Sequence, residues 1–239
     1  MGEKAKTALV LSAGAMFGAY HAGVWKGLAG RFQPDLIVGS SVGVLSGWVM
    51  ASGCAPEELE RLWLDAETGR LLRFRRQTQL MRRIEELHRA YTPRIPFGMI
   101  ALELPSLRLR LFQNTGLVNE ITPRHLLASC SIPLWFPAVR INGLRLADGG
   151  VRSTLPVWAA AQMGATRVLA VDCLPVGWQG WYRWPAGMLV PDRPAAPDLE
   201  VTILRPSQPL GGLSDILFWK RDNVARWIEL GERDAASLI

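Results

Sequence analysis

The chain has 239 residues, of which 49% are hydrophobic and 20% charged, and its formal net charge is +6. This composition supplies a sizeable core and excludes a disordered chain, a collagen-like chain and a disulfide-stapled miniprotein. The three cysteines (Cys54, Cys130 and Cys173) lie far apart and form no C-x-x-C pair, so neither a zinc cluster nor a disulfide framework is predicted, and reduced thiols in a cytoplasmic protein are expected.

Short apolar strands alternate with helices along the chain. Strands are predicted at residues 7–11, 35–38, 107–111, 140–148 (a hairpin about Asn142-Gly143), 167–172 and 199–204. Helices are predicted at residues 18–29, 42–51, 57–67, 71–91, 122–129, 155–163 and 213–239. This order predicts an α/β fold with a mostly parallel sheet. Since no linker or repeat divides the chain, residues 1–239 are predicted to form a single domain.

Residues 36–56 carry no charge, and Gly39, Gly43 and Gly47 give the G-x-x-x-G spacing found in membrane helices. The segment also contains four glycines and four serines. A strand that turns sharply into a buried helix explains these residues better than a membrane span. The apolar run at residues 7–11 is too short for a signal peptide.

A candidate nucleophile lies in this segment. Gly39, Ser41 and Gly43 form a G-x-S-x-G motif between a predicted strand and a predicted helix, which is the context that this motif requires. Small residues on both sides of the serine allow a strained turn, and this turn exposes the Ser41 hydroxyl at a helix N-terminus. The pattern favours nucleophilic catalysis by Ser41.

A serine nucleophile needs a base. None of the three histidines (His21, His88 and His125) follows the best acid candidate, so a triad in the order Ser, acid, His is excluded. That candidate is Asp148, which ends a predicted strand and precedes Gly149 and Gly150, where the backbone can pass close to a neighbouring side chain. A turn aspartate is the alternative interpretation. A desolvated carboxylate with a raised pKa can accept the serine proton directly.

The turn after the first strand is a candidate anion site. Residues 11–18 (LSAGAMFG) place small residues before a predicted helix, where successive backbone N–H groups can bind a phosphate or an oxyanion. Only Gly14 and Gly18 are glycines, so the segment does not match G-x-G-x-x-G and a dinucleotide site is disfavoured.

Taken together, these segments resemble the patatin-like phospholipase family. The matching stretches are residues 8–28, 35–53 around G-S-S-V-G, 127–137 (LASCSIPLWFP), 146–157 with the D-G-G motif, and 167–172. They cover most of the chain, and their joint occurrence in this order is more specific than any one of them. Residues 55–104 and 174–198 match little.

The resemblance implies a three-layer α/β/α fold with a mostly parallel sheet, and hydrolysis of acyl esters of phospholipids or other lipids without a metal or other cofactor. By position, Ser41 would be the nucleophile and Asp148 the base that activates it. The oxyanion hole would come from the backbone N–H groups of Gly14 and Ala15, with Ala13 as a further candidate.

Two positions depart from the family pattern. The oxyanion loop usually has three consecutive glycines, whereas this chain has Ala13-Gly14-Ala15, and alanine resists positive φ at a cost of about 1 kcal/mol. Phe17 stands where the family commonly has Arg or Lys. Two alternatives to hydrolysis therefore stay open: acyl transfer to another alcohol, and a catalytically weak lipid- or protein-binding module with the same fold.

The positive charge is local. Residues 70–94 carry eight arginines against two glutamates, and the rest of the chain is balanced. Apolar residues alternate with these arginines, which predicts a basic amphipathic helix on an anionic bilayer, and aromatic residues at 178–184 suit the membrane interface. The predicted membrane contacts are Arg70, Arg73, Arg75, Arg76, Arg82 and Arg83. The protein is thus predicted to be cytoplasmic and peripheral on the inner face of the membrane, and the alternative is a helical cap with a solvated face beside a packed lid. No motif supports a nucleic-acid partner.

Overall fold

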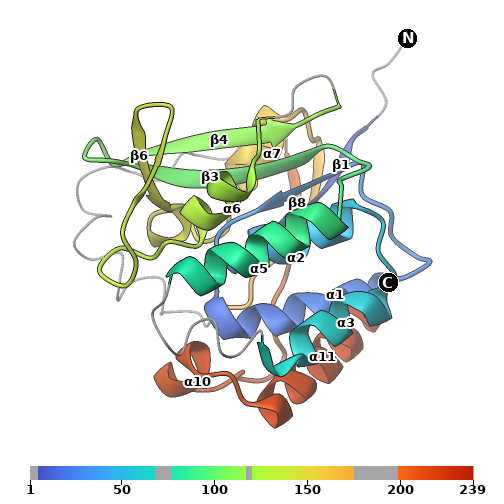
Figure 1. Ribbon diagram of the computed structural model, residues 1–239. Helices are drawn as coiled ribbons and strands as arrows, with labels where there is room; N and C mark the ends of the chain where they lie inside the picture. Colours follow the sequence, from blue (N-terminus) through green and yellow to red (C-terminus); the bar gives the residue numbers. More distant parts are fainter. Residues whose placement is uncertain (1–4, 68–76, 117–119, 175–198, 239) are drawn as a thin grey trace.

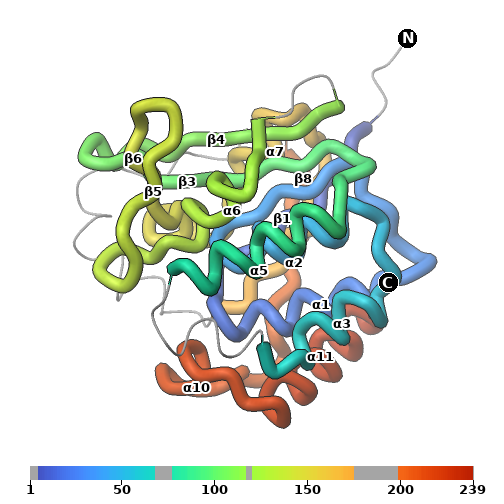
Figure 2. Tube along the Cα trace, in the orientation of Figure 1, coloured from blue at the N-terminus to red at the C-terminus, as the bar shows by residue number. Residues whose placement is uncertain are grey.

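The computed structural model describes residues 5–67, 77–116, 120–174 and 199–238. They contain an eight-stranded sheet in the order β5-β6-β3-β2-β1-β7-β8, with β4 paired to β3 outside this path (Figures 1 and 2). From β3 to β8 the neighbours in this order run parallel, whereas β4 and β6 lie antiparallel to β3, and β5 lies antiparallel to β6. The strands are β1 (Thr7–Leu11), β2 (Leu36–Gly39), β3 (Phe97–Leu104), β4 (Arg108–Asn114), β5 (Val139–Ile141), β6 (Leu144–Asp148), β7 (Arg167–Val171) and β8 (Glu200–Leu204).

Helices cover both faces of the sheet unequally (Figure 1). The helix α7 (Val157–Gln162) packs on one face, and the remaining helices pack on the other. Those helices are α1 (Ala19–Leu28), α2 (Val42–Ala51), α3 (Pro56–Leu64), α5 (Gln77–Ala90), α6 (Pro123–Ser129), α10 (Leu213–Leu217) and α11 (Arg221–Ala236), with the short 3-10 helix η1 (Ala15–Gly18) before α1.

Side chains along the central strands point alternately to the two faces of the sheet, and this divides the hydrophobic core into two clusters. Leu9 and Leu11 of β1 join the larger cluster under α1 and α2, and Ala8 and Val10 join the smaller cluster under α7. Successive side chains of a strand point to opposite faces, so a strand covered on both sides is apolar throughout. The predicted three-layer α/β/α architecture is confirmed.

Two element predictions need correction. The strand β3 was missed because its sequence, FGMIALEL, is an apolar run with only one β-branched residue, and its Met, Ala, Leu and Glu residues favour helix. The single helix predicted for residues 213–239 is wrong. The chain forms α10 and α11, and between them Trp219 donates its indole N–H to the Trp63 carbonyl at 3.1 Å, which holds the break against α3.

Residues 36–56 form β2, a turn and α2, as the strand–helix interpretation predicted. Within the described part of the chain, no helix is both long enough and apolar enough to cross a bilayer.

Candidate active site

The strand β3 brings two distant segments together. One edge of β3 pairs with β4 over its length, whereas β2 and β6 share the other edge. The strand β2 ends with Gly39 opposite Met99, and β6, running the other way, ends with Asp148 opposite Ala101. The carboxyl ends of β2 and β6 therefore point toward each other with one β3 residue between them, and this arrangement places Ser41 beside Asp148.

Ser41 occupies a strained turn between β2 and α2. Its φ is +52° and its ψ −124°, in a region that residues other than glycine rarely adopt. The glycines of the motif allow this turn to be tight. A Cβ at Gly39 would lie 2.5 Å from the Gly43 carbonyl oxygen, and a Cβ at Gly43 would lie 2.6 Å from the Leu11 carbonyl oxygen. The G-x-S-x-G segment thus has the strand–turn–helix context that its spacing predicted.

Ser129, at the end of α6, supports this turn and was missed by the sequence analysis. Its hydroxyl accepts a hydrogen bond from the Ser41 N–H at 3.1 Å and donates one to the Ile100 carbonyl at 2.7 Å. Ile100 is the β3 residue between the ends of β2 and β6, so Ser129 fills the place where neither strand continues. The only available signal was its position in residues 127–137, which carry part of the family resemblance.

Asp148 is positioned to accept a proton from Ser41. The Ser41 hydroxyl donates to Asp148 Oδ2 at 2.6 Å, and the Gly150 N–H donates to Asp148 Oδ1 at 2.7 Å. The side chain is buried, and this burial raises the pKa of Asp148 to about 7 against the opposing effect of both hydrogen bonds. A carboxyl group with a pKa near neutrality can act as a general base.

The Ala13-Gly14-Ala15 loop lies beside this pair. Ala13 donates its N–H to the Thr154 carbonyl at 2.8 Å, so this N–H is already used. For the N–H groups of Gly14 and Ala15, no acceptor is found within the described residues. Ala15 has a φ of +45° and lines the same groove as Ser41. The loop therefore offers two N–H groups, one of them on an alanine in a conformation that favours glycine.

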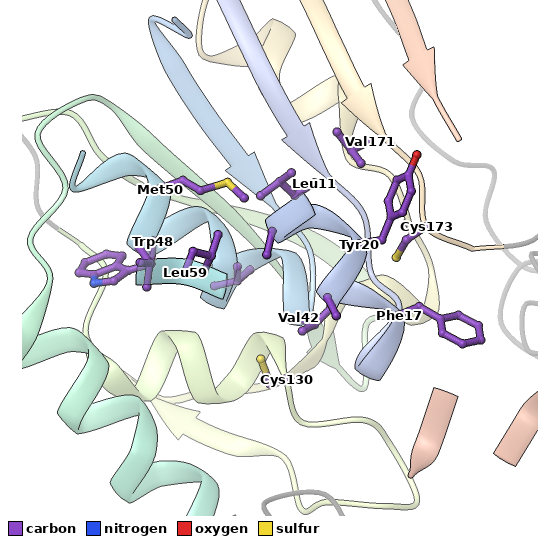
Figure 3. Close-up of a cluster of buried hydrophobic side chains, with 14 of the residues drawn as sticks. Leu11, Phe17, Tyr20, Val42, Trp48, Met50, Leu59, Cys130, Val171 and Cys173 are labelled. Carbon is purple, nitrogen blue, oxygen red and sulfur yellow. The ribbon is translucent and has the colours of Figure 1, made fainter. Parts of the chain in front are cut away.

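Phe17 belongs to the core. Its ring is fully buried and meets Trp227 of α11 edge to face, with centroids 5.1 Å apart. Figure 3 shows this ring pointing away from Val42 and Cys130, which both line the groove next to Ser41. The position therefore contributes packing between η1 and α11.

The histidines have other roles. His125 caps α6 by accepting from the Thr122 N–H at 3.2 Å, and His88 stacks on Trp48 with centroids 4.8 Å apart. His21 is fully buried, and this burial lowers its pKa to about 3. Within the described residues, none of the three hydrogen-bonds to Ser41 or Asp148, and no group of His, Cys, Asp and Glu side chains has the arrangement of metal ligands.

An apolar groove leads away from Ser41. It contains about 840 Å³ of space, part of it open to solvent, with α2 as its floor and α3 and α5 as its walls. Arg83 of α5 is the one charged residue in the described lining. Sequence analysis predicted the helices but not the groove, because their relative positions depend on tertiary packing.

The predicted membrane contacts are only partly within the described chain. Arg82 is exposed and has one long contact to Glu86 at 3.9 Å, whereas Arg83 pairs with Asp65 at 2.9 Å and with Glu86 at 3.1 Å. Four further contacts and the aromatic loop residues lie outside the described residues; these are Arg70, Arg73, Arg75, Arg76, Trp178, Trp181, Tyr182 and Trp184.

A layered α/β fold with a G-x-S-x-G turn between a strand and a helix is an arrangement found in serine hydrolases. A family model described as Patatin-like phospholipase matches residues 9–120 and 108–161, which include both Ser41 and Asp148. The chain belongs to the patatin-like phospholipase family, whose members are serine hydrolases that act on lipids.

Two solved structures are similar to this chain, and the likeness to one of them, VipD, supports the fold. VipD from Legionella pneumophila has a TM-score of 0.55 and 10% identity, with 99% of this chain and 67% of the VipD chain covered. The type III effector protein ExoU has a TM-score of 0.48 and 12% identity, with 98% of this chain and 52% of the ExoU chain covered. At such low identity the likeness to VipD supports the fold alone.

Proposed function

We propose that the protein is a lipid acyl hydrolase in which Ser41 is the nucleophile and Asp148 its general base. The observation that carries this proposal is the 2.6 Å hydrogen bond from the Ser41 hydroxyl to Asp148 Oδ2 at the start of an apolar groove. Membership of a phospholipase family gives the substrate class, and the groove suits an acyl chain.

The reaction proceeds in two steps. Asp148 accepts the Ser41 proton as the hydroxyl oxygen attacks the ester carbonyl, and the N–H groups of Gly14 and Ala15 stabilise the oxyanion. Collapse of this intermediate expels the alcohol, which takes the proton from Asp148, and leaves an acyl-serine. Water activated by Asp148 then attacks the acyl-serine and releases the fatty acid. The active base is the carboxylate, so kcat/KM should rise with pH through about 7.

Association with an anionic membrane is part of the proposal. Arg82, with 73% of its side chain exposed, and the basic residues of the preceding segment supply the charge that attracts acidic lipids. Arg83 contributes less to this attraction, because Asp65 and Glu86 balance its charge. Arg82→Gln should therefore weaken binding to anionic vesicles more than Arg83→Gln does.

The test is fatty-acid release from anionic mixed micelles by wild type, Ser41→Ala and Asp148→Asn. Both variants should lose at least about a hundredfold in rate, because each removes a group that takes part in bond making. Ser52→Ala is the matched control, since Ser52 lies just past the other end of α2 and, among the described residues, its hydroxyl bonds only to the Val49 carbonyl. Release that persists in folded Ser41→Ala would refute the proposed nucleophile.

A further inference from the structure

Three helices define where the apolar groove ends. The last lining residues along it are Val49 on α2, Leu59 on α3 and Leu87 on α5. Ser41 and Val49 are separated by eight residues of the turn and α2, so the groove extends roughly 12 Å from the hydroxyl at 1.5 Å per residue. Apart from Arg83 on α5, the described walls are apolar along this length, and no charged side chain of the described lining lies at the far end.

One turn beyond these last lining residues, a polar bridge joins the two walls. Tyr91, four residues after Leu87, donates its hydroxyl to Glu58 Oε1 at 2.6 Å, and Glu58 precedes Leu59 in α3. The Trp48 indole N–H donates to the Tyr91 carbonyl at 2.8 Å, which fixes the same segment to α2. These hydrogen bonds tie the three helices together just behind the last lining residues, although Trp48, Glu58 and Tyr91 do not themselves line the groove.

A second bridge joins the same walls nearer to Ser41. Arg83 of α5 and Asp65, the residue after α3, form an ion pair with a distance of 2.9 Å. Arg83 keeps 23% of its side chain exposed, whereas its neighbours Leu80 and Ile84 are buried, so this pair lies on the solvent side of the groove. The groove runs past this ion pair to Leu87, one turn before Tyr91.

We propose that the Tyr91–Glu58 bridge sets the acyl-chain length that the protein accepts. This inference rests on the proposed function, because it assigns the groove to the acyl group of the ester. A depth of roughly 12 Å corresponds to an extended chain of about eight to ten carbons. A longer chain has to break the bridge, which exposes the Glu58 carboxylate and the Tyr91 hydroxyl to apolar surface.

The length dependence has an expected size. Each methylene buried in the groove should raise kcat/KM about fourfold, which is the gain from removing one CH₂ from water. This increase should continue to about eight to ten carbons and then stop or reverse. A groove open at its far end would show no such break.

The experiment compares p-nitrophenyl esters of 4 to 16 carbons on wild type and Tyr91→Ala. Removing the Tyr91 side chain opens the end of the groove, so the break should move by about two carbons and the rate on the 12-carbon ester should rise roughly tenfold. Tyr91→Phe and Glu58→Gln keep the side-chain volume and remove the donor or the charged acceptor. These two variants should shift the chain length at which kcat/KM stops rising by less than Tyr91→Ala does. They take the place of Tyr91→Ala if that variant does not fold.

Tyr20→Phe is the matched control. Its hydroxyl also donates to a carboxylate, Asp234 Oδ2 at 2.9 Å, but on α11 and outside the groove lining. This variant should lose a comparable hydrogen bond without moving the break. A break that moves equally in Tyr20→Phe would show that general loosening, and not the Tyr91–Glu58 bridge, sets the length.

A binding series separates this inference from the proposed function. Calorimetric binding of saturated fatty acids of 6 to 16 carbons to Ser41→Ala needs no turnover, and its affinity should break at the same length. If this break appears while no ester is hydrolysed, the length inference stands and the hydrolase proposal fails. If hydrolysis depends on Ser41 but its break is absent or unchanged in Tyr91→Ala, the length inference is overturned and the hydrolase proposal stands.

Discussion

Two residues on the walls of the same groove, Ser41 and Ala15, have positive φ angles without being glycine, and their surroundings differ. At Ser41 the turn has glycines two residues before and after, a hydrogen bond from its N–H to Ser129 and one from its hydroxyl to Asp148. At Ala15 the turn is spanned by a backbone bond from the Phe17 N–H to the Gly14 carbonyl at 3.0 Å, and no side chain of the described residues hydrogen-bonds to the Ala15 N–H. Strain persists where neighbours hold it, so the turn at Ser41 is fixed by its partners while the adjacent loop retains a removable cost in free energy.

The largest expected effect is on the pH dependence of stability, and it comes from Asp148, which accepts the hydrogen bond of the Ser41 hydroxyl. Because burial raises the Asp148 pKa from 3.8 to about 7, the folded state binds this proton more tightly than the unfolded chain. The stability that it contributes is complete below pH 3.8 and is lost as the pH rises to about 7, a change of roughly 4 kcal/mol. Asparagine does not titrate, so Asp148→Asn removes this loss. The free energy of unfolding of Asp148→Asn, relative to wild type, should therefore rise by about that amount between pH 4 and pH 8.

Urea unfolding of both proteins at these two pH values measures this difference, and groups that titrate in both proteins cancel. His21, whose lowered pKa destabilises the fold in acid, is one such group. An advantage of Asp148→Asn that does not change with pH would mean that the carboxyl group titrates near its ordinary value. Asp148 would then lack the raised pKa that makes it a strong base.

A smaller effect is expected from Ser129→Ala. This change leaves the Ser41 N–H and the Ile100 carbonyl buried without their partner, so the free energy of unfolding should fall by about 2 kcal/mol. The rate of ester hydrolysis should also fall, chiefly in kcat, because the turn that presents Ser41 is less well fixed. Ser52→Ala, which removes one hydrogen bond at the C-terminal end of α2, should change stability less and leave kcat unchanged. Equal effects of the two variants would contradict a positioning role for Ser129.

The smallest effect is a gain at the less supported position. Ala15→Gly relieves the positive φ of an alanine, and we expect the free energy of unfolding to rise by about 1 kcal/mol. Thermal unfolding of wild type and Ala15→Gly measures this gain. Ala19→Gly, in the first turn of α1, is the control and should destabilise by a similar amount. A loss of stability in Ala15→Gly would show that the backbone at Ala15 is as well supported as the turn at Ser41.

Local patterns predicted the parts of the site. The G-x-S-x-G spacing, the D-G-G motif and the small residues of 11–18 each reflect steric demands within a few residues of backbone, so they are visible in the sequence. The capped start of α6 at Thr122 and Pro123 and the hairpin about Asn142 were readable for the same reason. The family resemblance then added the pairing of Ser41 with Asp148, which no local pattern required.

Tertiary structure alone decided how these parts meet. The sequence by itself determined an α/β fold, a strained serine turn and a candidate carboxylate, because each depends on nearby backbone sterics and on periodic burial. It did not reveal β3, whose apolar sequence has few β-branched residues and is compatible with a helix, yet this strand aligns the ends of β2 and β6. The Ser129 support and the Tyr91–Glu58 bridge were equally hidden, because each joins residues distant in sequence whose hydrogen bonds exist only after the helices have packed.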